Sequence, residues 1–113
     1  RYKNQGFVQT NTNKATVLTC PTDATLIVKS IYCSNNDASS GILVNINLVD
    51  ASDSNTEYEF FRDDVAAKSQ VNASPQGINL EAGDAVTVQA ATGSNKIQGV
   101  ISYAQIDRSQ ENG

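Results

Sequence analysis

The chain has 113 residues, a formal net charge of −4 at pH 7 and no histidine, and its length suits a single domain. Only 18% of the residues are charged, and their place is taken by 12 Asn, 11 Ser, 9 Thr and 8 Gln. Because histidine is the commonest general base and metal ligand, we expect no enzymatic activity and no cofactor. The 8 dispersed Lys and Arg residues do not form the basic surface that nucleic-acid binding requires. No apolar run approaches the ~20 residues of a membrane span.

Hydrophobic residues alternate with a period of two along most of the chain, which predicts β-strands. The alternation is clearest over residues 42–48, where Asn45 and Asn47 occupy the face opposite the aliphatic residues. Residues 25–33 are β-branched and apolar on both faces, so we expect a well-covered central strand there. The remaining strands are predicted at residues 2–10, 16–20, 57–61, 69–73, 78–80, 86–89 and 97–106.

Polar turns separate these strands and determine the predicted fold class. Pro21 begins one turn, residues 35–41 and 50–55 form polar loops, and residues 92–95 are predicted to join the last two strands as a hairpin. Residues 63–68 have a helix-like pattern, with an edge-strand connection as the alternative. Many short strands with frequent turns predict an all-β fold, a single antiparallel β-sandwich of jelly-roll type with about seven to nine strands.

The domain boundaries and the core follow from the same pattern. Residues 1–113 form one sandwich domain, in which residues 1–13 are an N-terminal arm or an edge strand and residues 108–113 are a polar tail. The inward positions of the alternation give the predicted core residues, which are Val17, Ile27, Ile31, Val44, Ile46, Leu48, Phe60, Val86, Val88 and Ile101.

The two cysteines, Cys20 and Cys33, flank one turn and one strand. A disulfide requires their Cα atoms to lie about 4.4–6.8 Å apart. If the two strands formed a hairpin, the cysteines would lie at its opposite ends, so we expect two buried free thiols. Two thiolates without histidine fall short of the four ligands of a structural zinc site, and we predict no metal site.

Acidic residues are concentrated between positions 50 and 64. Within this segment, Glu57 and Glu59 share one strand face, and Tyr58 and Phe60 share the other. We interpret this pattern as a solvated face over a core face, with a weak cation site as the alternative. A carboxylate pair for glycosidic cleavage would need a groove that a sandwich of this size hardly provides.

Several segments carry a resemblance when taken in order. They are TVLTCP at 16–21, TLIVKSIYCSN at 25–35, INLEAGDAVTVQA at 78–90 and VISYAQID at 100–107. Together they resemble small β-sandwich virion proteins of tailed bacteriophages, such as phages of marine bacteria and cyanobacteria, over residues 2–107. The resemblance implies a location in the virion and a role in decorating or cementing the capsid, or in the neck or tail. The resemblance implies no catalytic residues in this sequence.

The partners implied by this resemblance are a major capsid protein or another virion protein, together with further copies of the chain. The segment 1–13 is the best candidate for such a contact, because it can extend as an edge strand onto a neighbour. Its candidate partner-binding residues are Tyr2, Lys3, Asn4, Phe7 and Val8, and the last two would be apolar anchors. The alternative is that this segment is simply the first strand of its own sandwich.

Two other functions fit a sandwich of this composition. A carbohydrate-recognition module on a host-attachment fibre would carry an aromatic or calcium-bearing groove. A secreted adhesin-like domain would favour a disulfide between Cys20 and Cys33. A flat, Asn-rich face for contacts between copies would instead favour the virion role.

Overall fold

The fold is all-β, as predicted, in a computed structural model that describes residues 1–108. Of the predicted polar tail, residues 109–113 lie outside the described residues. The described chain forms nine strands and one 3-10 turn, and all strand pairs are antiparallel. The elements are β1 (Tyr2–Val8), β2 (Ala15–Thr19), β3 (Ala24–Asn35), β4 (Ile42–Asp50), η1 (Ala51–Asp53), β5 (Thr56–Val65), β6 (Gln70–Asn72), β7 (Ile78–Leu80), β8 (Ala85–Ala90) and β9 (Ile97–Asp107).

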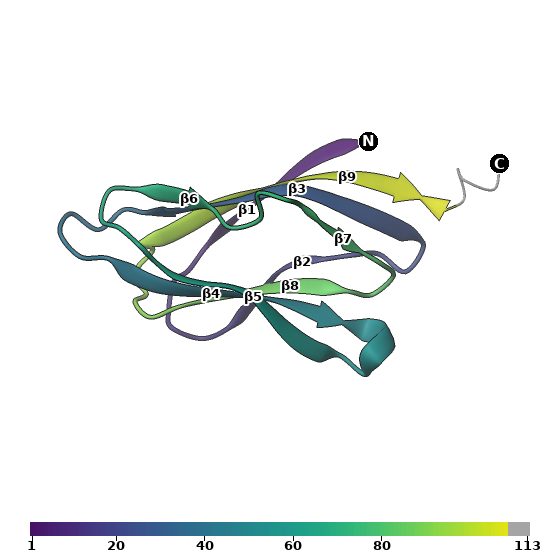
Figure 1. The fold of residues 1–113 in the computed structure, drawn as a ribbon, viewed down its shortest axis with the longest axis horizontal. Coiled ribbons are helices and arrows are strands. Elements are labelled where there is room, and N and C mark those ends of the chain that lie inside the picture. Colours follow the sequence, from purple (N-terminus) through teal and green to yellow (C-terminus); the bar gives the residue numbers. More distant parts are fainter. Residues whose placement is uncertain (109–113) are drawn as a thin grey trace.

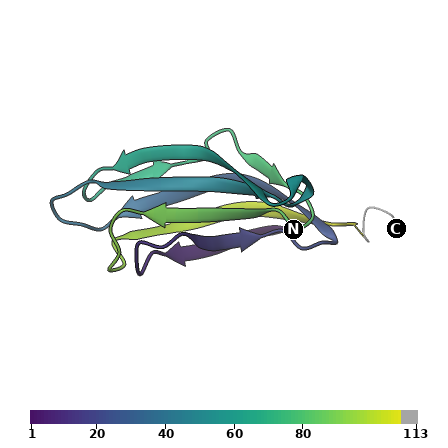
Figure 2. The same ribbon diagram turned by 90° about the horizontal axis from the view of Figure 1, so that it is seen from below.

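The strands form two sheets packed face to face (Figure 1). The five-stranded sheet has the order β1-β9-β3-β6, and β7 also pairs with β3. Because β6 and β7 pair with opposite ends of β3, they share one strand position. The four-stranded sheet has the order β2-β8-β4-β5, which Figure 2 shows from below. This is the strand order of a jelly roll, in which the chain crosses repeatedly between the two layers.

The core fills the space between the sheets and matches most of the predicted core residues. Six of them, Ile31, Val44, Ile46, Val86, Val88 and Ile101, are fully buried, and another three, Val17, Leu48 and Phe60, are partly buried against the core. Leu26, Val28 and Leu80 belong to the core as well, although the sequence pattern did not single them out.

The prediction for Ile27 was wrong, and a β-bulge is the reason. The register between β3 and β9 shifts between Val28 and Ser30, so Lys29 is an extra residue. Leu26 and Val28 therefore point into the core before the bulge, and Ile31 does so after it. Ile27 is left on the outer face of a strand that is central in its sheet but not covered on both sides.

Two predicted connections differ from the structure. Residues 92–95 do not close a hairpin, because β8 and β9 belong to different sheets. This loop instead packs against the connection that follows β1, where Ser94 N donates to Thr10 O (3.1 Å) and Asn95 N donates to Gln9 O (3.0 Å). Residues 63–68 end β5 and form a turn, and the helical turn lies at η1, where the Asp50 carboxylate accepts from Ser52 N.

Candidate protein-interaction site

The outer face of the five-stranded sheet is almost free of charge. We define this apolar face by the outward residues of four rows that the strand register places side by side. None of these residues is charged. Lys29, the extra residue of the bulge, lies beside them, with its Nζ 4.1 Å from the centroid of the Tyr2 ring. The rows are Tyr2, Ala104, Ile27 and Asn79; Asn4, Ser102 and Ser30; Gly6, Val100 and Tyr32; and Val8, Gln98, Ser34 and Gln70.

Exposed apolar surface is concentrated on this apolar face. Six large hydrophobic side chains are exposed among the described residues, and five of them lie here: Tyr2 (76% exposed), Val8 (45%), Ile27 (37%), Tyr32 (48%) and Val100 (44%). The polar row of Asn4, Ser102 and Ser30 separates Tyr2 and Ile27 from the group formed by Val8, Tyr32 and Val100. Single exposed hydrophobic residues are ordinary, whereas such grouping on one face marks a surface for interaction.

A shallow groove of about 470 Å³ crosses the apolar face between β1, β9 and β3. Val8, Tyr32 and Val100 contribute to its lining. A Cβ atom at Gly99 would lie 2.2 Å from Phe7 Cζ and 2.4 Å from Tyr32 O. The Phe7 ring therefore occupies the space that a side chain at position 99 would need, and it anchors β1 to the core.

The predicted partner-binding residues divide between two sides of β1. Tyr2, Asn4 and Val8 belong to the apolar face, whereas Lys3 and Phe7 alternate to the other side, where Phe7 packs against the core. All seven residues of β1 pair with β9. The segment is thus an edge strand of its own sandwich, which was the alternative to a free arm.

The outer edge of β1 also presents backbone groups. Gln105 N donates to Arg1 O (2.7 Å) and Gln9 N donates to Ile97 O (2.8 Å), so the odd-numbered residues of β1 bond to β9. In an antiparallel ladder the alternate residues then point their N–H and C=O groups the other way. These are Tyr2, Asn4, Gly6 and Val8, and they give β1 an open edge beside the apolar face.

The outer face of the four-stranded sheet, which we call the polar face, is different. Lys14 Nζ lies 3.0 Å from Glu57 Oε1, and Asn47 Nδ2 donates to the same oxygen at 3.3 Å. The hydrogen bond from Lys14, followed by that from Asn47, lowers the pKa of Glu57. Asn47 Oδ1 and Thr87 Oγ1 are buried although both residues point outward. Lys14, Glu57 and the Asn47 amide nitrogen therefore contact one another, whereas the side-chain oxygens of Asn45, Asn47 and Thr87 are buried without a hydrogen-bond partner among the described residues.

The acidic segment forms the edge of the four-stranded sheet. Glu57 and Glu59 are exposed, as predicted, and Arg62 Nη2 lies 2.9 Å from Glu59 Oε1. Tyr58 lies opposite the inward residue Leu48, as the alternation predicts, but it is 49% exposed and not part of the core, and its hydroxyl donates to Asp53 Oδ2. That hydrogen bond to a carboxylate raises the pKa of Tyr58.

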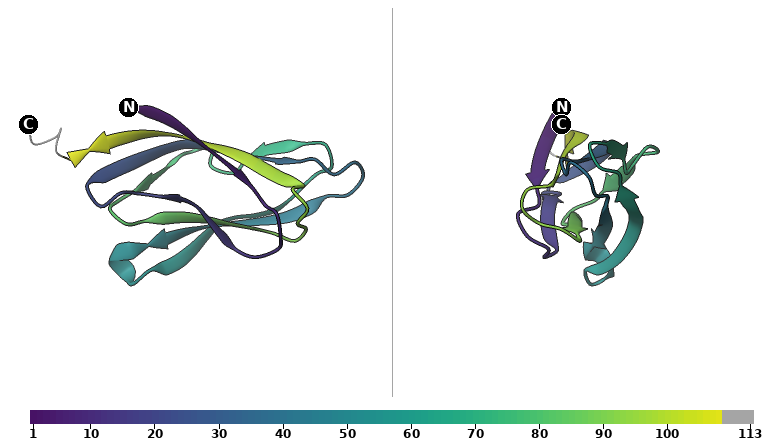
Figure 3. Two further views of the ribbon diagram at one scale, coloured as in Figure 1. Left: turned by 180° about the vertical axis from the view of Figure 1, so that it is seen from behind. Right: turned by 90° about the vertical axis from the view of Figure 1, so that its left-hand side faces the viewer.

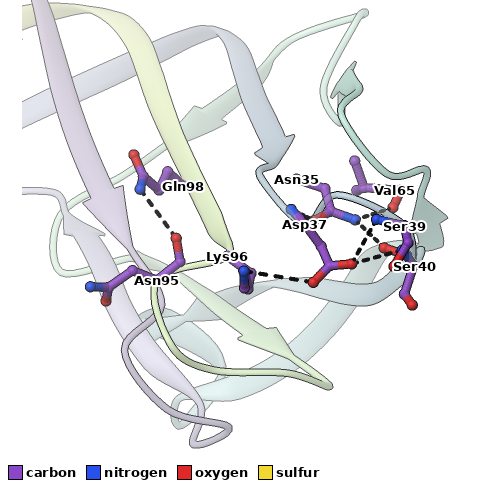
Figure 4. A network of polar contacts seen from close by, with 8 residues as sticks. All are labelled: Asn35, Asp37, Ser39, Ser40, Val65, Asn95, Lys96 and Gln98. Atoms are coloured by element: carbon purple, nitrogen blue, oxygen red, sulfur yellow. Dashed lines mark hydrogen bonds and ion pairs between the residues drawn. The ribbon is translucent and has the colours of Figure 1, made fainter.

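A separate polar network holds the loop between β3 and β4 (Figure 4). The buried Asn35 donates from Nδ2 to Val65 O (2.8 Å) and to Ser40 O (2.9 Å). The Asp37 carboxylate accepts from Ser40 N at 2.7 Å and lies 3.7 Å from Lys96 Nζ. Hydrogen bonds from the loop backbone are the main reason that the pKa of Asp37 is lowered. All these contacts stay within the loop and its neighbours, so the network is structural.

The cysteines are unpaired and buried, which confirms the prediction. Cys20 lies in the connection that follows β2, and Cys33 lies in β3. Because β2 and β3 belong to different sheets, these strands do not form a hairpin. Burial raises the pKa of Cys33 to about 12, which keeps this thiol protonated near neutral pH. Among residues 1–108, no group of three or more His, Cys, Asp or Glu side chains is placed to hold a metal ion. No helix in that range is long and apolar enough to cross a membrane.

Comparison with known proteins places the fold but not a family. No known protein family matches the sequence, and no curated protein matches it. The structure is similar to the Drosophila NLP core, with a TM-score of 0.56 and 13% sequence identity over 95% of this chain and 99% of that chain. The structure of the NLP core gives insight into pentamer formation and histone binding by that protein.

Two further solved structures share the architecture. A chain from the acid-stable capsid of the Helicobacter pylori bacteriophage KHP30 has a TM-score of 0.57 and 14% identity, over 95% of this chain and 92% of that chain. A chain from the disulfide-linked pili of Bacillus endospore appendages has a TM-score of 0.52 and 13% identity, over 93% and 82%. At such low identity these likenesses establish a jelly-roll β-sandwich, a fold that very different assemblies use.

Proposed function

We propose that this chain is a structural protein of a phage virion, which decorates or cements the capsid, or the neck or tail, through protein–protein contacts. The observation that carries the proposal is the apolar face, where five exposed hydrophobic side chains lie in rows without a charged residue. Covering such a surface releases apolar area from water without desolvating a carboxylate. The sequence resemblance to phage sandwich proteins and the likeness to a phage capsid chain support the same role.

In this role the protein contributes contacts between subunits of the particle and does not act as an enzyme. Its neighbour is a capsid protein or another virion subunit, and many copies act together. Each contact can be weak, because contacts repeated over a symmetric particle add through multivalency. The polar residues that surround the exposed side chains, such as Ser34, Gln70 and Gln98, provide hydrogen bonds at the rim of the contact.

Carbohydrate recognition is the second candidate. Tyr2 and Tyr32 are both exposed on the apolar face, and aromatic rings are suitable surfaces for stacking against a ligand. A host-attachment module would use these rings for a glycan, whereas a virion subunit would use them for another protein.

The two functions separate in one experiment. The tagged chain is supplied while particles assemble, the particles are purified, and the amount of chain that cofractionates is measured. We expect the intact chain to be particle-bound and the double variant Tyr32→Ser with Val100→Ser to be lost from particles while remaining folded. The matched control is Thr16→Ser on the polar face, which should remain bound. If the intact chain never joins particles and binds a defined glycan tightly, the carbohydrate function replaces the structural one.

A further inference from the structure

We infer that the apolar face docks the acidic edge of a second copy of this chain, so that copies associate head to tail. The acidic edge comprises residues 50–64, which run from the end of β4 through the 3-10 turn and along β5. The inference uses the same apolar face as the proposed function, but it requires no other virion protein.

Charge complementarity is the first argument. Residues 1–22 contain Arg1, Lys3 and Lys14 and no acidic residue, whereas residues 50–64 contain six acidic residues and only Arg62 as a cation. Lys14 is already paired with Glu57 of its own chain. Of the remaining cations, Lys29 lies beside the apolar face, while Arg1 precedes β1 and Lys3 is on the inner side of β1. No ion pair involves these three among the described residues.

The acidic edge carries an excess of negative charge. Lys14 and Arg62 pair with Glu57 and Glu59, and these pairs leave four carboxylates of the edge without a cation within 4 Å in the described part of the chain. They are Asp50, Asp53, Asp63 and Asp64. The cation Lys29 beside one surface and the unpaired carboxylates on the other favour contact between the two surfaces, and the excess of carboxylates disfavours contact of the acidic edge with itself.

Tyr58 is the second argument. It is the one large exposed hydrophobic residue among those described that lies outside the apolar face, and it projects from the middle of the acidic edge. Tyrosine is enriched among the residues that anchor protein interfaces. The groove beside Val100 and Tyr32 is open to receive an aromatic ring, so an apolar anchor and an apolar groove are both present on each copy.

The placement of the two surfaces determines the kind of assembly. β1 is the edge of one sheet and lies near β2, whereas β5 is at the far edge of the other sheet. The end-on view in Figure 3 shows β1 and β5 on opposite sides of the sandwich. Because the two surfaces of a copy are different and distant, each copy binds one neighbour on either side. Such a heterologous contact generates a ring if the rotation closes and a filament if it does not.

The test uses purified chain alone and measures its mass in solution over a concentration series. The groove is blocked by Val100→Asp, and the edge is altered by Tyr58→Ser together with Asp53→Lys. We expect the unaltered chain to form oligomers and each variant alone to be monomeric. An equimolar mixture of the two variants should form a dimer and nothing larger, because only one intact groove and one intact edge remain in each pair.

Matched controls show whether the substitutions act through the interface. Thr16→Asp adds the same carboxylate on the polar face, and Asp23→Lys makes the same charge reversal in an exposed turn. Both should assemble as the unaltered chain does, and unfolding curves should show that all variants are folded. Three results would overturn the inference: an unaltered chain that is monomeric at its highest soluble concentration, single variants that retain the oligomer, or a mixture that stays monomeric.

The outcome is independent of the proposed function. A chain that assembles with itself but never joins a particle supports this inference and contradicts the virion role. A chain that joins particles while remaining monomeric in isolation contradicts this inference alone.

Discussion

The two outer faces of this sandwich are built from the same kind of strand and yet have opposite chemistry. On the polar face, Lys14, Glu57 and Asn47 contact one another, and outward oxygens of Asn47 and Thr87 are buried. On the apolar face, tyrosine, valine and isoleucine side chains stand exposed in rows with no charged neighbour except Lys29. One face pairs charged groups within the chain but leaves buried oxygens of Asn47 and Thr87 without a hydrogen-bond partner, and the other leaves apolar area uncovered.

The difference teaches which face is available to a partner. A partner on the polar face would have to displace contacts that already exist, whereas a partner on the apolar face gains burial without breaking any. Asn45 and Asn47, which the alternation placed together on one face of their strand, belong to the polar face, where Asn47 bonds to Glu57. Under the proposed role, the hydrophobic side chains of the apolar face, and not these asparagines, make the contacts between subunits.

The largest expected effect comes from the core that supports both faces. Ile46 is fully buried between the sheets, so Ile46→Ala should reduce the free energy of unfolding by about 2–5 kcal/mol. Denaturant unfolding followed by circular dichroism measures this change. The control is Ile27→Ala on the apolar face, which should change stability far less because this side chain is exposed. A loss of less than about 0.5 kcal/mol for Ile46→Ala would place it outside the core.

The next effect concerns the attachment of β1 beneath the apolar face. Gly99→Ala places a methyl group where the Phe7 ring and the Tyr32 carbonyl lie, so it should cost about 1–3 kcal/mol of stability. Hydrogen exchange should show that β1 is released more readily than β4. Gly6→Ala is the matched control, because its Cβ would lie 3.8 Å from the nearest atom, Gly99 O. Equal losses for the two variants would contradict the close packing at Gly99.

The dependence of stability on pH tests the pairing of Glu57 on the polar face. Because its pKa is lowered in the folded chain, its contribution to stability is present above the ordinary pKa of glutamate and is lost as the pH falls through the lowered pKa. Glu57→Gln should therefore flatten the acid side of the stability curve, measured as thermal midpoint against pH. Lys14→Met should flatten it in the same way, and Tyr32→Ser on the apolar face should not. An acid limb that is unchanged by Glu57→Gln would contradict this role.

The smallest effect on stability is expected on the apolar face itself. Tyr32 is half-exposed, so Tyr32→Ser should change the free energy of unfolding by no more than about 0.5 kcal/mol. The same substitution should weaken self-association, measured by sedimentation. A large loss of stability would show that Tyr32 supports the fold rather than a contact.

Sequence pattern was sufficient for much of the fold. The alternation at residues 42–48 and the turns between strands indicated an all-β sandwich, and they placed Val44, Ile46, Val86 and Val88 in its core correctly. These predictions succeed because a strand with one buried face must alternate, and that requirement is local. The cysteines were likewise predicted to be free and buried.

A bulge limited the prediction of the core. Lys29 in β3 and Phe60 in β5 are each an extra residue opposite a partner strand, and each reverses the inward and outward positions that follow. Ile27 and Ile31 were both assigned to the core, but the bulge between them places them on opposite faces and leaves Ile27 exposed. Tyr58 lies opposite the inward residue Leu48 and is nevertheless exposed, which the bulge at Phe60 does not explain. A bulge depends on the partner strand as well as on its own residues, so alternation within one strand cannot reveal it.

The sequence by itself determined the class of fold, the free cysteines and the segregation of acidic residues into positions 50–64. Only the tertiary structure decided which residues share a surface. Tyr2, Tyr32 and Val100 are distant along the chain, and pairing of β1, β9 and β3 brings them onto one face. The crossing of strands between sheets likewise places the acidic segment at the edge far from β1. Long-range pairing is specified by the whole core, because many buried side chains must fit together before any one register is preferred.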